Sequence, residues 1–73
     1  MSLAEVVIGS SARIAEVAGG DPMALRLLEM GLTPGVNVRV VGAAPWGGPL
    51  ELEVRGYRLS IRRHEAARIA IAS

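Results

Sequence analysis

The sequence LRLLEMGLTPG, residues 25–35, joins the end of an amphipathic helix to the turn that redirects the chain. Leu and Met fill most of its first half, and Gly31 is the residue type that commonly ends a helix in the left-handed conformation. Asp21 precedes this helix as a candidate N-cap, and Pro22 is favoured at the first helical position. The sequence therefore predicts a short helix that begins after Asp21 and ends at Gly31.

Alternating apolar and polar residues surround this helix and predict five short strands. One strand precedes the helix and four follow it, at residues 12–17, 36–40, 50–54, 57–61 and around 69–71. The alternation in the first strand slips between Ile14 and Val17, which indicates a β-bulge. Short strands separated by tight turns are typical of a small β-barrel.

The third and fourth predicted strands are separated only by Arg55 and Gly56, which predicts a two-residue hairpin. Such a hairpin places Glu53 opposite Arg58 and keeps the apolar residues of both strands on one face. We expect these two charged residues to form an ion pair across the strands, which contributes about 0.2–1 kcal/mol.

Five strands with one helix in the first long connection predict a mainly β fold. We expect a small five-stranded SH3-like barrel with one short helix between the first and second strands. The 73 residues include no cysteine, so a single domain over residues 1–73 must depend on an aliphatic core rather than on disulfides. Closure of the barrel is expected to remove the exposed edges of the sheet.

Charge and hydropathy exclude several classes of protein. The formal net charge of +1 argues against a dedicated nucleic-acid-binding protein, which carries a clear basic excess. No apolar stretch approaches the roughly 20 residues of a membrane-spanning helix. The first residues also lack the basic and apolar regions of a signal peptide. We therefore expect a cytoplasmic protein with no direct membrane insertion and no nucleic-acid partner.

Candidate catalytic and metal-binding residues are few. His64 is the only imidazole, no cysteine is present, and Asp21 is already assigned to the helix cap. Because His64 and Glu65 are adjacent, we expect their side chains to diverge in a solvated charged turn rather than to share a metal ion. The sequence therefore predicts no enzymatic activity, no catalytic or metal-ligating residues and no cofactor.

The apolar surface of the predicted helix is wider than a core requires. Leu27, Ala24 and Leu28 lie at its centre. Leu25 and Met30 lie on its flanks, so that the arc spans roughly 220°, whereas a core-facing stripe spans roughly 100°. We therefore predict that Leu25 and Met30 contact a protein partner or a second copy of the chain. The alternative is that residues 3–8 fold across one flank and cover it.

Trp46 is the third candidate interface residue. It lies in a seven-residue loop with two prolines and two glycines, where little local structure can cover an indole. Tryptophan is over-represented among binding hot spots, which favours a role at a partner surface. The alternative is that the indole folds over the mouth of the barrel and extends the core.

Three motifs in the order LLEMGLTPG, GGPL and RLSIRRHEAARIAI resemble those of FeoA, the small cytoplasmic component of bacterial ferrous iron transport systems. The resemblance covers residues 3–72. It implies an SH3-like barrel that is not an enzyme and that acts beside FeoB, a membrane permease with a cytosolic G domain. It implies no catalytic residues.

These observations together predict a non-enzymatic accessory or regulatory protein of ferrous iron uptake that docks on the cytosolic part of the FeoB permease. The alternative is an SH3-like regulatory barrel that binds a transition metal, as in the C-terminal domains of metal-dependent repressors, or RNA. Arg62 and Arg63 beside Arg58 form the candidate basic patch for RNA. Stacking aromatics are missing from that face, and two glutamates of the third strand lie alongside it, which argues against RNA.

Overall fold

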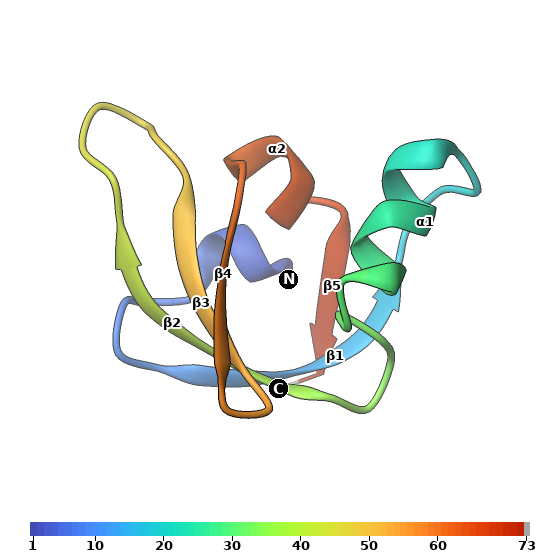
Figure 1. Ribbon diagram of the computed structural model, residues 1–73, viewed down its shortest axis with the longest axis horizontal. Helices are drawn as coiled ribbons and strands as arrows, with labels where there is room; N and C mark the ends of the chain where they lie inside the picture. Colours follow the sequence, from blue (N-terminus) through green and yellow to red (C-terminus); the bar gives the residue numbers. More distant parts are fainter. Residues whose placement is uncertain (73) are drawn as a thin grey trace.

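The computed structural model describes residues 1–72, which form a strongly curved antiparallel sheet with short helices around it (Figure 1). The elements in chain order are the 3-10 helix η1 (Leu3–Glu5), β1 (Ser11–Val17), α1 (Pro22–Glu29), β2 (Asn37–Ala43), β3 (Leu50–Val54), β4 (Tyr57–Ile61), α2 (Arg63–Ala66) and β5 (Ile69–Ala72). The strand order in the sheet is β4-β3-β2-β1-β5, and every neighbouring pair is antiparallel. The predicted mainly β fold, with α1 between the first and second strands, is confirmed.

Two local features of the sheet confirm what the sequence predicts. The pairing of β1 with β5 shifts between Ile14 and Glu16, which is the expected bulge. The turn residues of the β3–β4 hairpin, Arg55 and Gly56, have φ values of 49° and 85°. Positive φ at both central residues is the turn geometry that matches the twist of two antiparallel strands.

The ion pair predicted across this hairpin is wrong. Glu53 and Arg58 are cross-strand partners, but they form no salt bridge within residues 1–72. On the same hairpin, the Ser60 hydroxyl donates a hydrogen bond of 2.8 Å to Glu51. Exposed ion pairs gain little Coulomb energy in water and cost side-chain entropy. Placing Glu53 opposite Arg58 is therefore not enough to form an ion pair.

Helix α1 begins and ends as the sequence predicts. The Asp21 carboxylate accepts a hydrogen bond of 3.1 Å from the backbone N–H of Ala24, and a proline occupies the first helical position. Gly31 has φ of 100°, and beside it the Tyr57 hydroxyl donates a hydrogen bond to the carbonyl of Met30. A Cβ atom at position 31 would overlap this hydroxyl. Glycine is therefore favoured there by backbone conformation and by space.

Aliphatic side chains from every strand and every helix form one core. Its buried members are Leu3, Ile14, Leu27, Leu32, Val36, Val38, Val40, Leu50, Leu52, Val54, Ile61, Ala66 and Ile69. The sequence places Leu28 near the centre of the buried arc of α1, and this prediction is wrong. Leu27 is fully buried, whereas Leu28 is only half-buried. Leu25, Arg26 and Glu29 are exposed, so only one side of the helix is covered.

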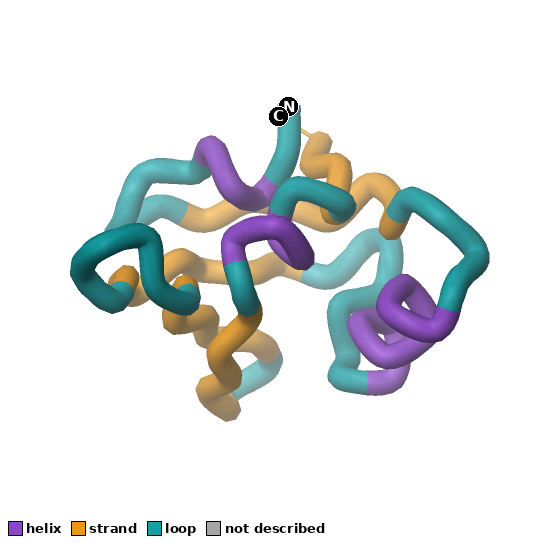
Figure 2. Tube along the Cα trace, turned by 90° about the horizontal axis from the view of Figure 1, so that it is seen from above, coloured by secondary structure: helices purple, strands orange, loops and turns teal. Residues whose placement is uncertain are grey.

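The barrel is not closed by hydrogen bonds. β4 and β5 are the edge strands of the sheet and form no ladder with each other within the described residues, so the expected removal of sheet edges is incomplete. Helix α2 connects these two strands, and η1 packs against α2 and β5. The N-terminal segment therefore packs mainly there rather than on the flank of α1, and Figure 2 shows η1 and α1 well apart.

Candidate functional site

The three residues predicted to contact a partner do not form one surface. Leu25 and Met30 belong to α1 and its C-cap, whereas Trp46 lies in the loop that joins β2 to β3. The loop and α1 lie at opposite ends of the molecule in both views (Figures 1 and 2). The longest dimension of the molecule is 29 Å. The structure therefore offers two separate candidate surfaces.

The loop at residues 44–49 holds Trp46 in an unusual backbone conformation. The N–H of Gly48 donates to the carbonyl of Pro45 at 3.2 Å, which closes a tight turn. The two central residues, Trp46 and Gly47, have φ values of 61° and 75°. The Trp46 side chain is 98% exposed, so the alternative that its indole folds over the mouth of the barrel is wrong.

We expect Trp46→Asn to leave the protein as stable as before or to stabilise it by about 0.5–1 kcal/mol. A bulky residue at positive φ costs about 1–2 kcal/mol, and Asn followed by Gly is the preferred pair for a turn of this geometry. The exposed indole has few contacts to lose. Urea denaturation followed by circular dichroism measures the change. A loss of more than about 0.5 kcal/mol, beyond the usual range of surface substitutions, would show that the indole packs on the protein in solution.

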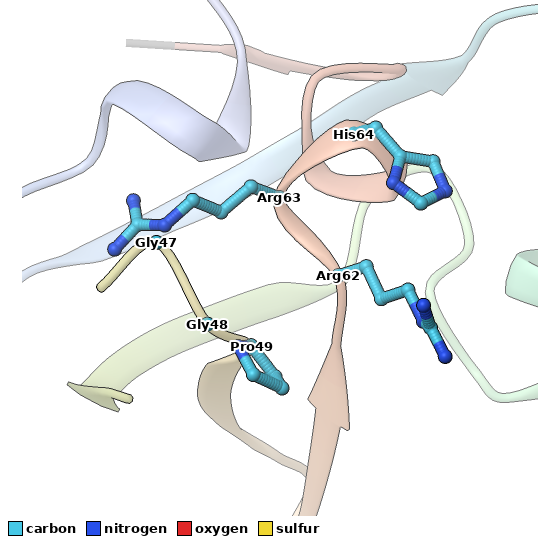
Figure 3. A pocket seen from close by; sticks show the side chains of 6 residues that line it. All are labelled: Gly47, Gly48, Pro49, Arg62, Arg63 and His64. Carbon is cyan, nitrogen blue, oxygen red and sulfur yellow. The ribbon is translucent and has the colours of Figure 1, made fainter. Parts of the chain in front are cut away.

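A hollow of about 600 Å³ lies beside this turn and is lined by residues of the loop and of α2 (Figure 3). The lining residues are Gly47, Gly48, Pro49, Arg62, Arg63 and His64, and we call this hollow the loop pocket. The two segments meet because Leu50 of β3 pairs with Ile61 of β4, so that the residues beyond each strand end lie side by side. The hairpin register in the sequence already contains the signal for this juxtaposition.

Glu65 differs most from its predicted place. The sequence predicts a solvated charged turn, but residues Arg63–Ala66 form α2, and Glu65 is 3% exposed. Its carboxylate pairs with the guanidinium of Arg26 on α1 and accepts a hydrogen bond of 2.7 Å from the backbone N–H of Arg62. A glutamate three residues after the N-cap is the sequence signal that could have predicted this helix. His64 is exposed, so the two neighbouring side chains diverge as expected.

The second candidate surface is a depression of about 340 Å³ along α1, which we call the α1 groove. It is lined by Gly19, Gly20, Asp21, Pro22, Ala24, Leu25 and Leu28. Leu25 is 58% exposed at this groove. Met30 does not line it and is half-buried against the core.

One charged group lies at the rim of the α1 groove. The Arg68 guanidinium donates a hydrogen bond of 2.6 Å to Asp21, and with the N–H of Ala24 it lowers the pKa of the Asp21 carboxyl below its ordinary value. Asp21 is therefore ionised at neutral pH and paired with Arg68. The remaining lining of the groove is mainly apolar.

Two further observations concern metals and membranes. Within residues 1–72, no three His, Asp or Glu side chains gather in a group that could hold a metal ion. None of the helices in the same residues has the length and apolar character needed to cross a bilayer.

Comparison with known proteins relates this fold to one family. A model of the FeoA domain matches residues 1–73. The chain is 37% identical over 71 residues to the Fe(2+) transport protein A/Fe(2+) transporter FeoB fusion protein of Porphyromonas gingivalis. The match covers 97% of this chain but 8% of the fusion protein.

Comparison with solved structures also relates this fold to FeoA proteins. The crystal structure of Stenotrophomonas maltophilia FeoA complexed with zinc, described as an SH3 domain protein, has 36% identity and a TM-score of 0.85, over 99% of this chain and 89% of that chain. The solution structure of Chlorobium tepidum FeoA has 35% identity and a TM-score of 0.88, over 97% of this chain and 68% of that chain. These similarities confirm the predicted SH3-like fold. The chain therefore belongs to the FeoA domain family.

Proposed function

We propose that this protein is an accessory component of ferrous iron transport that binds the cytosolic part of a FeoB-type permease. The observation that carries the proposal is the Porphyromonas gingivalis relative, in which an FeoA-like segment is joined to a transporter in one chain. Covalent linkage raises the effective concentration of one part beside the other, which is useful when the two parts work in contact. Membership of the FeoA family also agrees with the predicted absence of enzymatic activity.

Two exposed apolar residues support binding to a protein partner. Leu25 is 58% exposed on the α1 groove, and Trp46 is 98% exposed on the opposite end of the molecule. Tryptophan is enriched at binding hot spots, and a leucine at the edge of a mainly apolar depression offers apolar area that a partner can bury. Met30 contributes less in this proposal, because its side chain packs partly on the core and its carbonyl accepts the Tyr57 hydrogen bond.

We expect Leu25→Glu to weaken binding to the full-length permease by at least about tenfold without unfolding the protein. A carboxylate in the α1 groove must be desolvated when a partner covers it, and this cost exceeds the roughly 1.4 kcal/mol of a tenfold change. In the free protein the same carboxylate stays in water. Biolayer interferometry with the permease in nanodiscs measures the affinity, and circular dichroism measures folding.

The matched control is Val7→Glu, which places the same charge on another exposed apolar residue outside the α1 groove and the loop pocket. This variant should bind like the wild-type protein. Wild-type binding by Leu25→Glu would exclude the α1 groove as the docking surface. Absence of any binding by the wild-type protein would overturn the proposed function itself.

A further inference from the structure

We propose that the loop pocket recognises a carboxylate-bearing segment of a partner protein, with Trp46 covering an apolar side chain next to that carboxylate. The inference rests on the proposed function and deepens it, because it names a second contact and its chemistry. Arg62, Arg63 and His64 line the pocket, and Trp46 precedes the lining residue Gly47 in the same turn. The turn that forms one wall of this cationic hollow therefore also carries an exposed indole.

The two arginines of the loop pocket are not held in salt bridges by neighbouring acidic groups of the described residues. Arg62 and Arg63 are exposed and form no salt bridge within residues 1–72. The nearby Glu65 is buried and paired with Arg26. Glu51 keeps its charge while it accepts the Ser60 hydroxyl, but it forms no salt bridge with either arginine within the described residues. Neither guanidinium group is thus occupied by an ion pair within the described residues.

Figure 3 distinguishes the two arginines. The Arg63 side chain extends along the pocket towards Gly47, whereas Arg62 and His64 extend to the other side of the β4–α2 junction. Arg63 is therefore placed to make the direct contact, and Arg62 adds only the longer-range attraction of a charge on the other side of the junction. A guanidinium group binds a carboxylate with two parallel hydrogen bonds, which gives both affinity and orientation.

Trp46 adds specificity for a protein segment. The turn that holds it has positive φ at both central residues, a geometry that favours Asn or Gly, so the turn itself does not require an indole. Tryptophan and arginine are both among the residue types enriched at binding hot spots. When a bound segment lies against the exposed indole, it can exclude water from the ion pair and so strengthen it.

The observations favour a protein segment over a nucleic acid. Single-stranded nucleic acids stack on several aromatic side chains along a basic groove. The chain has one Trp and one Tyr, and Tyr57 lies beside the C-terminus of α1, away from the loop pocket. The net charge of +1 also gives little general attraction for a phosphate backbone.

The test is a titration of the ¹⁵N-labelled protein with the peptide acetyl-Leu-Glu-Asp-Leu-amide, followed by NMR. We expect localised shifts at the Trp46 indole N–H and at the amides of Gly47, Gly48 and Arg63. Arg63→Gln should weaken binding about tenfold, as expected for the loss of a charge-assisted hydrogen bond. The matched control Arg58→Gln, which removes an exposed and unpaired arginine outside the pocket, should bind within about twofold of the wild-type protein.

Several results would overturn the proposal. These are shifts spread over the whole surface, equal affinities for Arg63→Gln and Arg58→Gln, or the same shifts with the peptide in which Lys replaces both acidic residues. Equal shifts with inorganic phosphate would indicate an unspecific anion site, and larger shifts with a single-stranded RNA oligonucleotide would indicate a nucleic-acid site.

The full-length permease then separates this inference from the proposed function. Reduced permease binding by Arg63→Gln, but not by Arg58→Gln, would support both. Equal permease binding by the wild-type and Arg63→Gln proteins would overturn the assignment of the carboxylate to the permease. If the wild-type protein binds the peptide but not the permease, the proposed function fails and the carboxylate site stands.

Discussion

Replacement of Leu27 by alanine is expected to remove most of the free energy of unfolding of this protein. Leu27 is fully buried in the aliphatic core, and truncation of such a residue costs about 2–5 kcal/mol. A core of this size rarely supplies more than about 3–5 kcal/mol of net stability. The Leu27→Ala variant should therefore be substantially unfolded at room temperature. Urea denaturation followed by far-UV circular dichroism measures the effect.

Fluorescence is a poor probe for this experiment, because Trp46 is the only indole and is already 98% exposed in the folded protein. Leu25→Ala is the matched control on the same helix. Leu25 is 58% exposed, so its truncation should change stability by no more than about 0.5 kcal/mol. The half-buried Leu28 should give an intermediate loss. Equal losses for Leu25→Ala and Leu27→Ala would contradict the assignment of the buried side of α1.

Removal of the Arg26 guanidinium is expected to destabilise the protein by about 3 kcal/mol, at the lower end of the cost of leaving a buried charge unpaired. Arg26 joins α1 to the carboxylate of Glu65, which is 3% exposed. Arg26→Met keeps an unbranched side chain that favours a helix but removes the countercharge. The Glu65 carboxylate then retains only the hydrogen bond from the backbone N–H of Arg62. Chemical denaturation at neutral pH measures the loss.

The two partners of this ion pair should respond unequally. Glu65→Gln should cost only about 1–2 kcal/mol, because it leaves an arginine whose side chain is 62% exposed and can be hydrated. The double variant R26M/E65Q should be more stable than R26M alone, since it contains no unpaired buried charge. Arg58→Met, at an exposed arginine without a salt bridge, is the control. Equal losses for Arg26→Met and Arg58→Met would show that the pair contributes nothing.

The sequence by itself determined the features that depend on a few neighbouring residues. The cap at Asp21 and the left-handed stop at Gly31 act through backbone groups within one helical turn, so both ends of α1 could be predicted. The hairpin at Arg55 and Gly56 is equally local, and its length sets the pairing of β3 with β4. The bulge in β1 is visible as a slip in the alternation of side chains.

The chemistry of the loop pocket could be predicted from the sequence only in part. Trp46 and the basic residues Arg62 and Arg63 could be identified from residue type and loop composition. The hollow that brings the two arginines next to the loop of Trp46 depends on how far β3 and β4 extend and on the conformation of that loop. The positive φ of Trp46 could not be predicted, because a bulky residue is rare in that region.

Only the tertiary structure decided which side chains are buried and which surfaces are separate. Helical periodicity gives the angle of Leu27 and Leu28 around α1, but not how much of the helix the curved sheet covers. The sequence predicts a solvated charge at Glu65, because the residue that neutralises it, Arg26, lies 39 positions earlier in the chain. Burial of a charge depends on such a distant partner, whereas caps and turns depend on adjacent backbone groups. Local pattern therefore sets the elements, and the way they pack determines the surface they present.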